Sequence, residues 1–181
     1  MKRAAARIRN HSRALAALLV AAIAVPLSAA AESPPSIEAQ VAELKAENDR
    51  LRTLLPSQSH AMIDVAYHFT NLWFAGRERN WPLAQFYFNE SRSRIAWALR
   101  IVPARRISSG ELVLQPIFDA FDKAQLADLK RAIENKNARE FTSTYKAALN
   151  GCTGCHIAAE KPYLQLVLPK APENRIVRFS P

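Results

Sequence analysis

Cys152-Thr153-Gly154-Cys155-His156 is the stretch that decides the class of this 181-residue chain, because it contains both cysteines and the only histidine of the C-terminal half. Two thiols at this spacing can each form a thioether with one of the two vinyl groups of a haem, and a histidine directly after the second thiol can ligate the iron. The C-x-x-C-H pattern therefore predicts one covalently attached haem c. Cys152 and Cys155 would be its attachment points and His156 its proximal iron ligand.

Three other interpretations of the two cysteines are a thioredoxin-like redox pair, half of a zinc site and a structural disulfide. A structural zinc ion needs four ligands, and no second Cys or His pair lies nearby in the sequence. A redox C-x-x-C opens a helix after a strand in a βαβ pattern, which this sequence does not show. The haem interpretation is favoured over all three.

Residues 1–31 have the pattern of a secretory signal peptide. Five basic residues without any acid precede an apolar run from Ala14 to Leu27, and Ser28 to Ala31 offer small side chains for a signal peptidase. The alternative is an uncleaved membrane anchor, but its uninterrupted part from Ala14 to Val25 is alanine-rich, short for a bilayer and closed by Pro26. We expect cleavage after Ala31 and export to the periplasm, an oxidising compartment compatible with paired cysteines.

Removal of the signal peptide with its five positive charges lowers the formal net charge from +9 to +4. The basic character of the chain is thus partly a property of the signal. No basic run with interleaved aromatic residues remains, so nucleic-acid binding is not expected. The membrane would be a partner only if the signal segment were retained.

After a proline-containing linker at 32–36, residues 37–55 predict a short coiled-coil helix. Apolar residues and one asparagine recur at alternating spacings of four and three: Ile37, Val41, Leu44, Asn48, Leu51 and Leu55. Asn48 occupies an a position, where a buried amide favours a parallel dimer in register, and Glu47 would face Arg52 of the second copy. A parallel homodimer through 37–55 is expected. A trimer and an amphipathic helix packed on its own domain are the alternatives.

Residues 57–160 predict an all-α fold, an antiparallel four-helix bundle preceded by the coiled-coil helix. The apolar spacing indicates helices over about 59–75, 81–101, 116–135 and 138–160, without a strand pattern of comparable strength. Gly76 is expected to stop the first helix, Asn80 to cap the second, and the third to bend near Asp122. Residues 102–115 are expected to form an exposed connection, and the tail at 161–181 to cover part of the bundle or the haem edge.

The position of the haem motif restricts the sixth iron ligand. No methionine or histidine follows His156, so a ligand must come from upstream, where the mature chain offers His60, Met62 and His68 in the first helix. Helical phase favours Met62, which shares the apolar face of that helix; His68 lies beside the face and His60 points almost opposite. Met62 is the expected distal ligand and His68 the alternative, and an iron without a protein sixth ligand also remains open.

This arrangement resembles the cytochrome c-prime family and its low-spin relatives. In those proteins the last helix of a four-helix bundle bears C-x-x-C-H and the first helix presents the distal residue. The resemblance covers residues 57–160. A second resemblance is to exported haem proteins that share the block Leu72-Trp73-Phe74-Ala75-Gly76 followed by Asn80-Trp81-Pro82-Leu83-Ala84.

Together these features predict an exported monohaem c-type cytochrome that transfers single electrons to and from redox partner proteins, and not an enzyme. The alternative is a five-coordinate haem protein that binds a small gas such as nitric oxide or carbon monoxide, for sensing, transport or detoxification. In a third interpretation, self-association through the coiled coil is the main function and the haem domain is a structural or assembly module.

Overall fold

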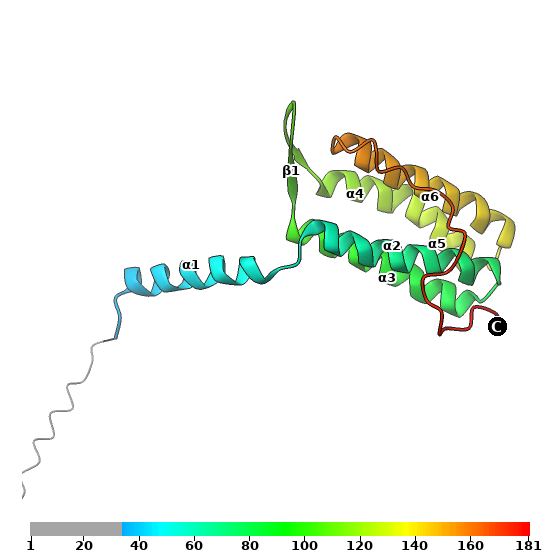
Figure 1. Cartoon of the computed structure of the whole chain (residues 1–181), viewed down its shortest axis with the longest axis horizontal. Helices are drawn as coiled ribbons and strands as arrows, with labels where there is room; N and C mark the ends of the chain where they lie inside the picture. The colour runs from blue at the N-terminus through cyan, green and yellow to red at the C-terminus, as the bar shows by residue number, and fades with distance from the viewer. Residues whose placement is uncertain (1–33) are drawn as a thin grey trace, which may run out of the picture. The chain divides into compact units, whose positions relative to one another are not determined.

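The computed structural model describes residues 34–181. The expected signal peptide at 1–31 lies outside the described residues. In chain order the elements are α1 (Ile37–Leu54), α2 (Gln58–Arg77), α3 (Trp81–Ile101), β1 (Ala104–Ile107), β2 (Gly110–Val113), α4 (Gln115–Phe121), the π-helical turn η1 (Asp122–Leu126), α5 (Ala127–Glu134) and α6 (Ala138–Ala158). The chain is thus mostly helical, as expected (Figure 1).

Tertiary contacts divide the chain into two units, with the boundary between Lys45 and Ala46, within α1. No residue of α1 is buried. Within residues 34–181, no helix combines the length and the apolar character needed to cross a bilayer.

Helices α2 and α3 form the most extensively packed pair (Figure 1). The Ser57 side chain caps α2 by accepting the His60 N–H, and the Asn80 side chain caps α3 by accepting the Leu83 N–H at 3.3 Å, as expected for Asn80. The expectation that Gly76 stops the first helix is wrong. Helix α2 continues to Arg77, and a Cβ added at Gly76 would lie 2.1 Å from the Phe141 ring on α6. Gly76 is therefore a point of close helix packing.

The expected exposed connection at 102–115 contains a β-hairpin. Strands β1 and β2 pair antiparallel with Ala104 opposite Val113 and Ile107 opposite Gly110 (Figure 1). Gly110 has φ of +133°, a conformation that few other residues adopt, and it closes the tight turn after Ser109. Four-residue strands that include adjacent arginines give little alternating hydrophobicity, which is why the sequence pattern did not indicate them.

The segment from Gln115 to Glu134 is one helical path in three parts, α4, η1 and α5. The bend expected near Asp122 falls at the start of the π-helical turn η1, and such wider turns are a common cause of helix kinks. An ion pair fixes this point to α3, because Arg92 Nε and Nη2 donate to the Asp122 carboxylate at 2.6 and 2.7 Å. The two-pronged contact joins two helices through a planar pair of charged groups.

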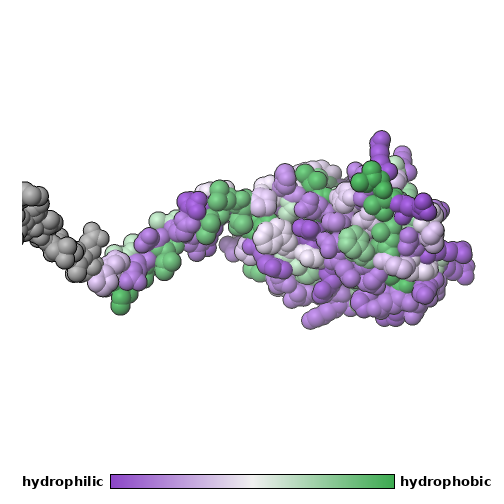
Figure 2. All heavy atoms as spheres, turned by 90° about the horizontal axis from the view of Figure 1, so that it is seen from below, coloured by the Kyte–Doolittle hydropathy of each residue, from purple (hydrophilic) through white to green (hydrophobic). Residues whose placement is uncertain are grey.

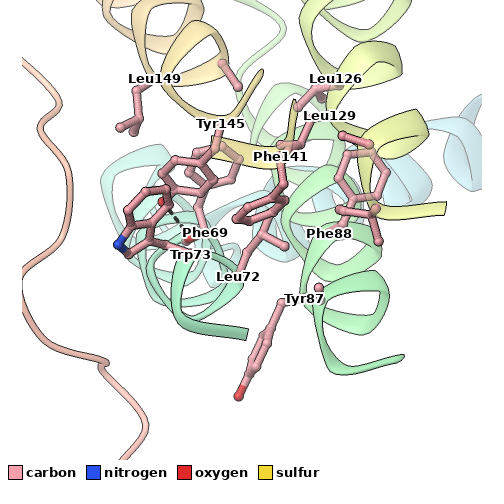
Figure 3. Close-up of a cluster of buried hydrophobic side chains, with 14 of the residues drawn as sticks. Phe69, Leu72, Trp73, Tyr87, Phe88, Leu126, Leu129, Phe141, Tyr145 and Leu149 are labelled. Atoms are coloured by element: carbon pink, nitrogen blue, oxygen red, sulfur yellow. Dashed lines mark hydrogen bonds between the residues drawn. The ribbon is translucent and has the colours of Figure 1, made fainter. Parts of the chain in front are cut away.

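The core contains a cluster of aromatic rings from α2 and α6 (Figure 3). Phe69 and Tyr145 stack with ring centroids 4.7 Å apart, and Trp73 lies 4.9 Å from Tyr145. The buried Tyr145 hydroxyl donates to the Phe69 backbone carbonyl at 2.8 Å, so its polar tip is satisfied inside the apolar cluster. These contacts hold α2 and α6 in a fixed relation beside the pocket described below.

The tail at 161–181 packs on the helices, as its apolar composition indicated. Leu168 and Phe179 pack against the core, and the Phe179 ring stacks on Tyr87 with centroids 6.2 Å apart. Figure 1 shows the tail, in orange to red, returning from the end of α6 across the helices. It therefore belongs to the folded unit.

Candidate functional site

One pocket collects the residues that the sequence singled out. Its cavity volume is about 200 Å³, it opens to solvent, and contributions come from α2, α3, α4, α6 and the tail. Nearly all lining side chains are apolar, as is typical of cofactor sites. Cys152, Cys155, His156 and Met62 all line it.

The two thiols lie on one face of α6, because residues three positions apart are neighbours on a helix. Both cysteines are free. Burial, together with the neighbouring Cys155 thiol, raises the pKa of Cys152 to about 12, and burial also raises the pKa of Cys155. At neutral pH both side chains are therefore protonated, unlike the low-pKa thiolates of redox-active C-x-x-C pairs.

Helix α6 runs through the whole C-x-x-C-H motif and ends at Ala158. The cysteines consequently lie in its last turns and not at a helix N-terminus, where the macrodipole would stabilise a thiolate. Among residues 34–181, no three Cys, His, Asp or Glu side chains converge as a metal-binding group. Neither observation favours the redox-pair or the zinc interpretation.

His156 is oriented by a backbone carbonyl of the tail. Its Nδ1 lies 3.0 Å from the Leu164 carbonyl oxygen. Since a carbonyl can only accept, this hydrogen bond requires the proton on Nδ1 and leaves Nε2 as the nitrogen with a free lone pair. A metal-binding histidine commonly has this arrangement, in which the second ring nitrogen donates to a carbonyl or carboxylate.

Met62 lines the pocket from α2, together with Val65, Ala66, Phe69 and Thr70. These positions follow the helical period, so the phase argument from the sequence selected the helix face that borders the pocket. Met62 thus shares the pocket with His156, although the two residues are far apart in the sequence.

The other two candidates of the same helix lie elsewhere. His60 is exposed and does not line the pocket. His68 faces α3, where its Nε2 lies 3.9 Å from the Glu90 carboxylate. Burial lowers the pKa of His68, and the Glu90 carboxylate only partly opposes this effect. The structure therefore does not bring His60 or His68 to the cysteines.

Sequence reasoning missed several residues that shape the pocket. Gly151 allows the Phe121 ring to approach α6 beside Cys152, because a Cβ there would lie 2.6 Å from the ring. The tail, which the sequence predicted to cover part of the bundle, contributes Leu166, Val167 and Pro169 to the lining. The glycine directly before the first cysteine was a signal in the sequence for close packing. The contact made by the Leu164 backbone could not be predicted in this way, because it does not depend on which amino acid occupies the position.

Comparison with known proteins adds no relative from which a function could be transferred. No protein-family model, curated protein or solved structure matches this chain.

Proposed function

We propose that the protein is an exported monohaem c-type cytochrome that transfers electrons. The observation that supports the proposal most directly is the gathering of Cys152, Cys155, His156 and Met62 around one large apolar pocket. Cys152 and Cys155 are the cysteines of the C-x-x-C motif, His156 directly follows them, and Met62 belongs to a different helix. This donor set is that of a covalently attached, axially ligated haem.

The pocket fits a haem in chemical character. Cys152 and Cys155 would form the two thioether bonds, for which thiols on one helix face and directed to one pocket are required. Phe69, Ile95 and Leu114, with the other apolar lining residues, would exclude water from the macrocycle and raise the cost of a net charge on the iron. A haem bound there supplies one-electron redox chemistry.

The two residues proposed to hold the iron have separate roles. His156, held with Nδ1 as the donor to Leu164, would coordinate through Nε2. Met62 would coordinate through its thioether, a ligand that raises the reduction potential and suits electron transfer. Met62 otherwise serves as an adaptable packing residue on the α2 face.

We further propose that α2, α3, the α4–η1–α5 segment and α6 form an antiparallel four-helix bundle, the architecture that the cytochrome c-prime resemblance implies. The packing of α2 on α3 and of α5 on α6 supports this arrangement. The signal pattern at 1–31 supports export to the periplasm, where redox proteins would be the partners.

The first test is covalent haem attachment. The full chain is expressed with a periplasmic haem-maturation system, and haem is detected on a denaturing gel. The wild type is expected to stain, and a variant with both Cys152→Ala and Cys155→Ala is expected to lose the stain. An unstained wild type would exclude the proposed function.

The second test separates electron transfer from gas binding. Met62→Leu removes the sulfur at nearly constant volume, and His68→Gln changes the other candidate on α2 as the matched control. A low-spin optical spectrum in the wild type that becomes high-spin only in Met62→Leu supports the Met-ligated electron carrier. A wild-type spectrum that is already high-spin and shifts with carbon monoxide supports the gas-binding alternative, in which Val65 and Phe69 border an open coordination position.

The exposed stripe of α1 is proposed to pair with a second copy of this chain. Ile37, Leu44 and Leu51 are 75%, 69% and 49% exposed, an uncommon arrangement for a helix without a partner. Figure 2 shows green, hydrophobic spheres among the purple ones along this helix. The a-position Asn48 and the Glu47 and Arg52 charges favour a parallel copy as the occupant.

A further inference from the structure

The tail contacts the haem motif through two hydrogen bonds. The Leu164 carbonyl accepts from His156 Nδ1 at 3.0 Å, and the Leu166 N–H donates to Thr153 Oγ1 at 3.2 Å. Thr153 and His156 are three residues apart on α6 and therefore neighbours on the helix surface. Two residues of the pentapeptide are thus paired with backbone groups of Leu164 and Leu166, two residues apart in one short tail segment.

A sharp reversal after α6 brings the tail to this position. Glu160 has φ of 57°, and the following Lys161 N–H donates back to the His156 carbonyl at 2.8 Å. This left-handed backbone conformation is unfavourable for any residue other than glycine, so other contacts must stabilise it. The Glu160 carboxylate supplies them by accepting the Ser108 N–H at 2.8 Å and the Ser108 hydroxyl. The β-hairpin therefore stabilises the turn that directs the tail to His156.

Beyond this turn the tail forms part of the pocket wall. Leu166, Val167 and Pro169 line the pocket, and Leu168 packs against the core. Val167 is nevertheless 76% exposed, so the wall at this point is thin. Displacement of residues 164–169 would open the pocket beside the cysteines and free the His156 ring at the same time.

The far end of the tail is anchored on α2. The Glu173 and Asn174 N–H groups both donate to Asn71 Oδ1, at 3.1 and 3.0 Å, and Asn174 Nδ2 donates to the Tyr67 hydroxyl at 2.7 Å. Asn71 is fully buried, and its Nδ2 has no hydrogen-bond partner among the described residues. A buried amide that leaves one donor unsatisfied is costly, so the two bonds to the tail are the contacts that favour asparagine at this position.

We infer that the tail is the positioning element for the proximal iron ligand: the Leu164 carbonyl fixes the His156 ring, Thr153 holds the tail two residues further on through the Leu166 N–H, and Asn71 anchors the segment on the helix that contains Met62. The inference rests on the proposed haem function. Thr153 and Asn71 are positioning residues in this scheme, because they act on His156 through the tail. Their role explains why one position between the cysteines contains a hydroxyl.

The test compares Thr153→Val with Thr153→Ser in the haem-loaded full chain. Valine keeps the shape of threonine but removes the acceptor for the Leu166 N–H, whereas serine keeps the hydroxyl. A third variant ends at Pro169 and lacks the anchored end of the tail. The measurements are hydrogen exchange of the 164–169 segment by mass spectrometry and the iron–histidine stretching frequency by resonance Raman spectroscopy. The frequency is recorded for the ferrous wild type and each variant in a Met62→Leu background, because the iron–histidine mode is detected only when the ferrous iron has no sixth ligand.

Loss of one net hydrogen bond predicts about tenfold faster exchange of this segment in Thr153→Val, and the truncated variant, which loses three hydrogen bonds to α2, should exchange at least as fast. The iron–histidine frequency should fall in both, because a ring that no longer donates to Leu164 is a weaker base toward the metal. Thr153→Ser should match the wild type in both measurements.

Haem staining distinguishes the two ways in which the scheme can fail. If every variant contains covalent haem and Thr153→Val keeps both the exchange rate and the stretching frequency of the wild type, the positioning role of the tail is wrong while the cytochrome proposal stands. If the wild type contains no covalent haem, the proposed function fails and the inference fails with it.

Discussion

At the scale of the residue, Cys152 has the most testable acid–base property. Its thiol pKa is raised from an ordinary value of 9.0 to about 12, first by burial and then by Cys155. Above pH 9 the unfolded chain releases this proton while the folded chain retains it until about pH 12. The free energy of unfolding of the haem-free protein should therefore fall as the pH rises through this window, by about 1.4 kcal/mol per pH unit for one such group.

The measurement is urea unfolding of haem-free wild type and Cys152→Ala between pH 8 and the alkaline limit of the fold. The variant is expected to lose stability less steeply, with a residual slope from Cys155 and Tyr145, whose pKa values are also raised by burial. Haem attachment would convert the thiol to a thioether that has no proton to release. Parallel slopes for wild type and Cys152→Ala would contradict the burial of this thiol.

The side chains of the candidate site could be predicted from the sequence, but its backbone contacts could not. The motif spacing indicated the two thiols and His156, and helical phase placed Met62 on the face that lines the pocket. Contacts made by backbone groups were not predictable, because the Leu164 carbonyl has the same chemistry in every residue type. For Glu90, the pairing with Arg94 four residues on follows from helical spacing, whereas the contact with His68 joins two helices and could not be predicted.

At the scale of the element, the close approach of α2 and α6 depends on Gly76. An added Cβ would lie 2.1 Å from the Phe141 ring, which is itself fully buried and cannot move without disturbing the aromatic cluster. Gly76→Ala is therefore expected to lower the free energy of unfolding by about 1–3 kcal/mol, as overpacked core substitutions do, despite the better helix propensity of alanine. Chemical denaturation with a circular-dichroism readout measures the change.

The double variant Gly76→Ala with Phe141→Leu provides the control. Leucine is smaller than the phenylalanine ring and leaves space for the new methyl group, so the two changes together should cost less than the sum of their separate effects. Strict additivity would show that α2 and α6 are not in contact at this point.

Helices could be predicted from the sequence where the apolar spacing was strong. Prediction failed for the β-hairpin, whose conformation depends on contacts with residues distant in the sequence. Strong apolar spacing indicated the long helices, and the capping role of Asn80 followed from residue type alone. The β-hairpin was missed because its four-residue strands are held partly by distant groups. Arg105 of β1 donates to the side chain of the buried Gln58 at 2.6 Å, a contact between residues 47 positions apart.

At the scale of the whole molecule, the exposed face of α1 predicts that the mature chain self-associates. An isolated helix of 18 residues is marginal in water, and pairing with a second copy would bury the apolar stripe and offset that cost. Glu47 now pairs with Arg50 of the same helix at 2.7 Å, an exposed contact that contributes little and can yield to Arg52 of a second copy. Charge complementarity is therefore available across a parallel pair.

Sedimentation equilibrium of the haem-loaded chain beginning at residue 32 measures this association. A dimer is expected, and deletion of 37–55 should give a monomer that retains the haem spectrum, because α1 contributes no residue to the pocket lining.

Glu47→Lys should weaken the dimer through repulsion from Arg52, and adding Arg52→Glu should restore it, which a nonspecific apolar contact would not do. Asn48→Leu is expected to strengthen association while mixing oligomeric states, since the buried amide that favours two strands is lost. A monomeric intact chain would refute the coiled coil and leave the haem proposal untouched, because the two rest on separate parts of the sequence.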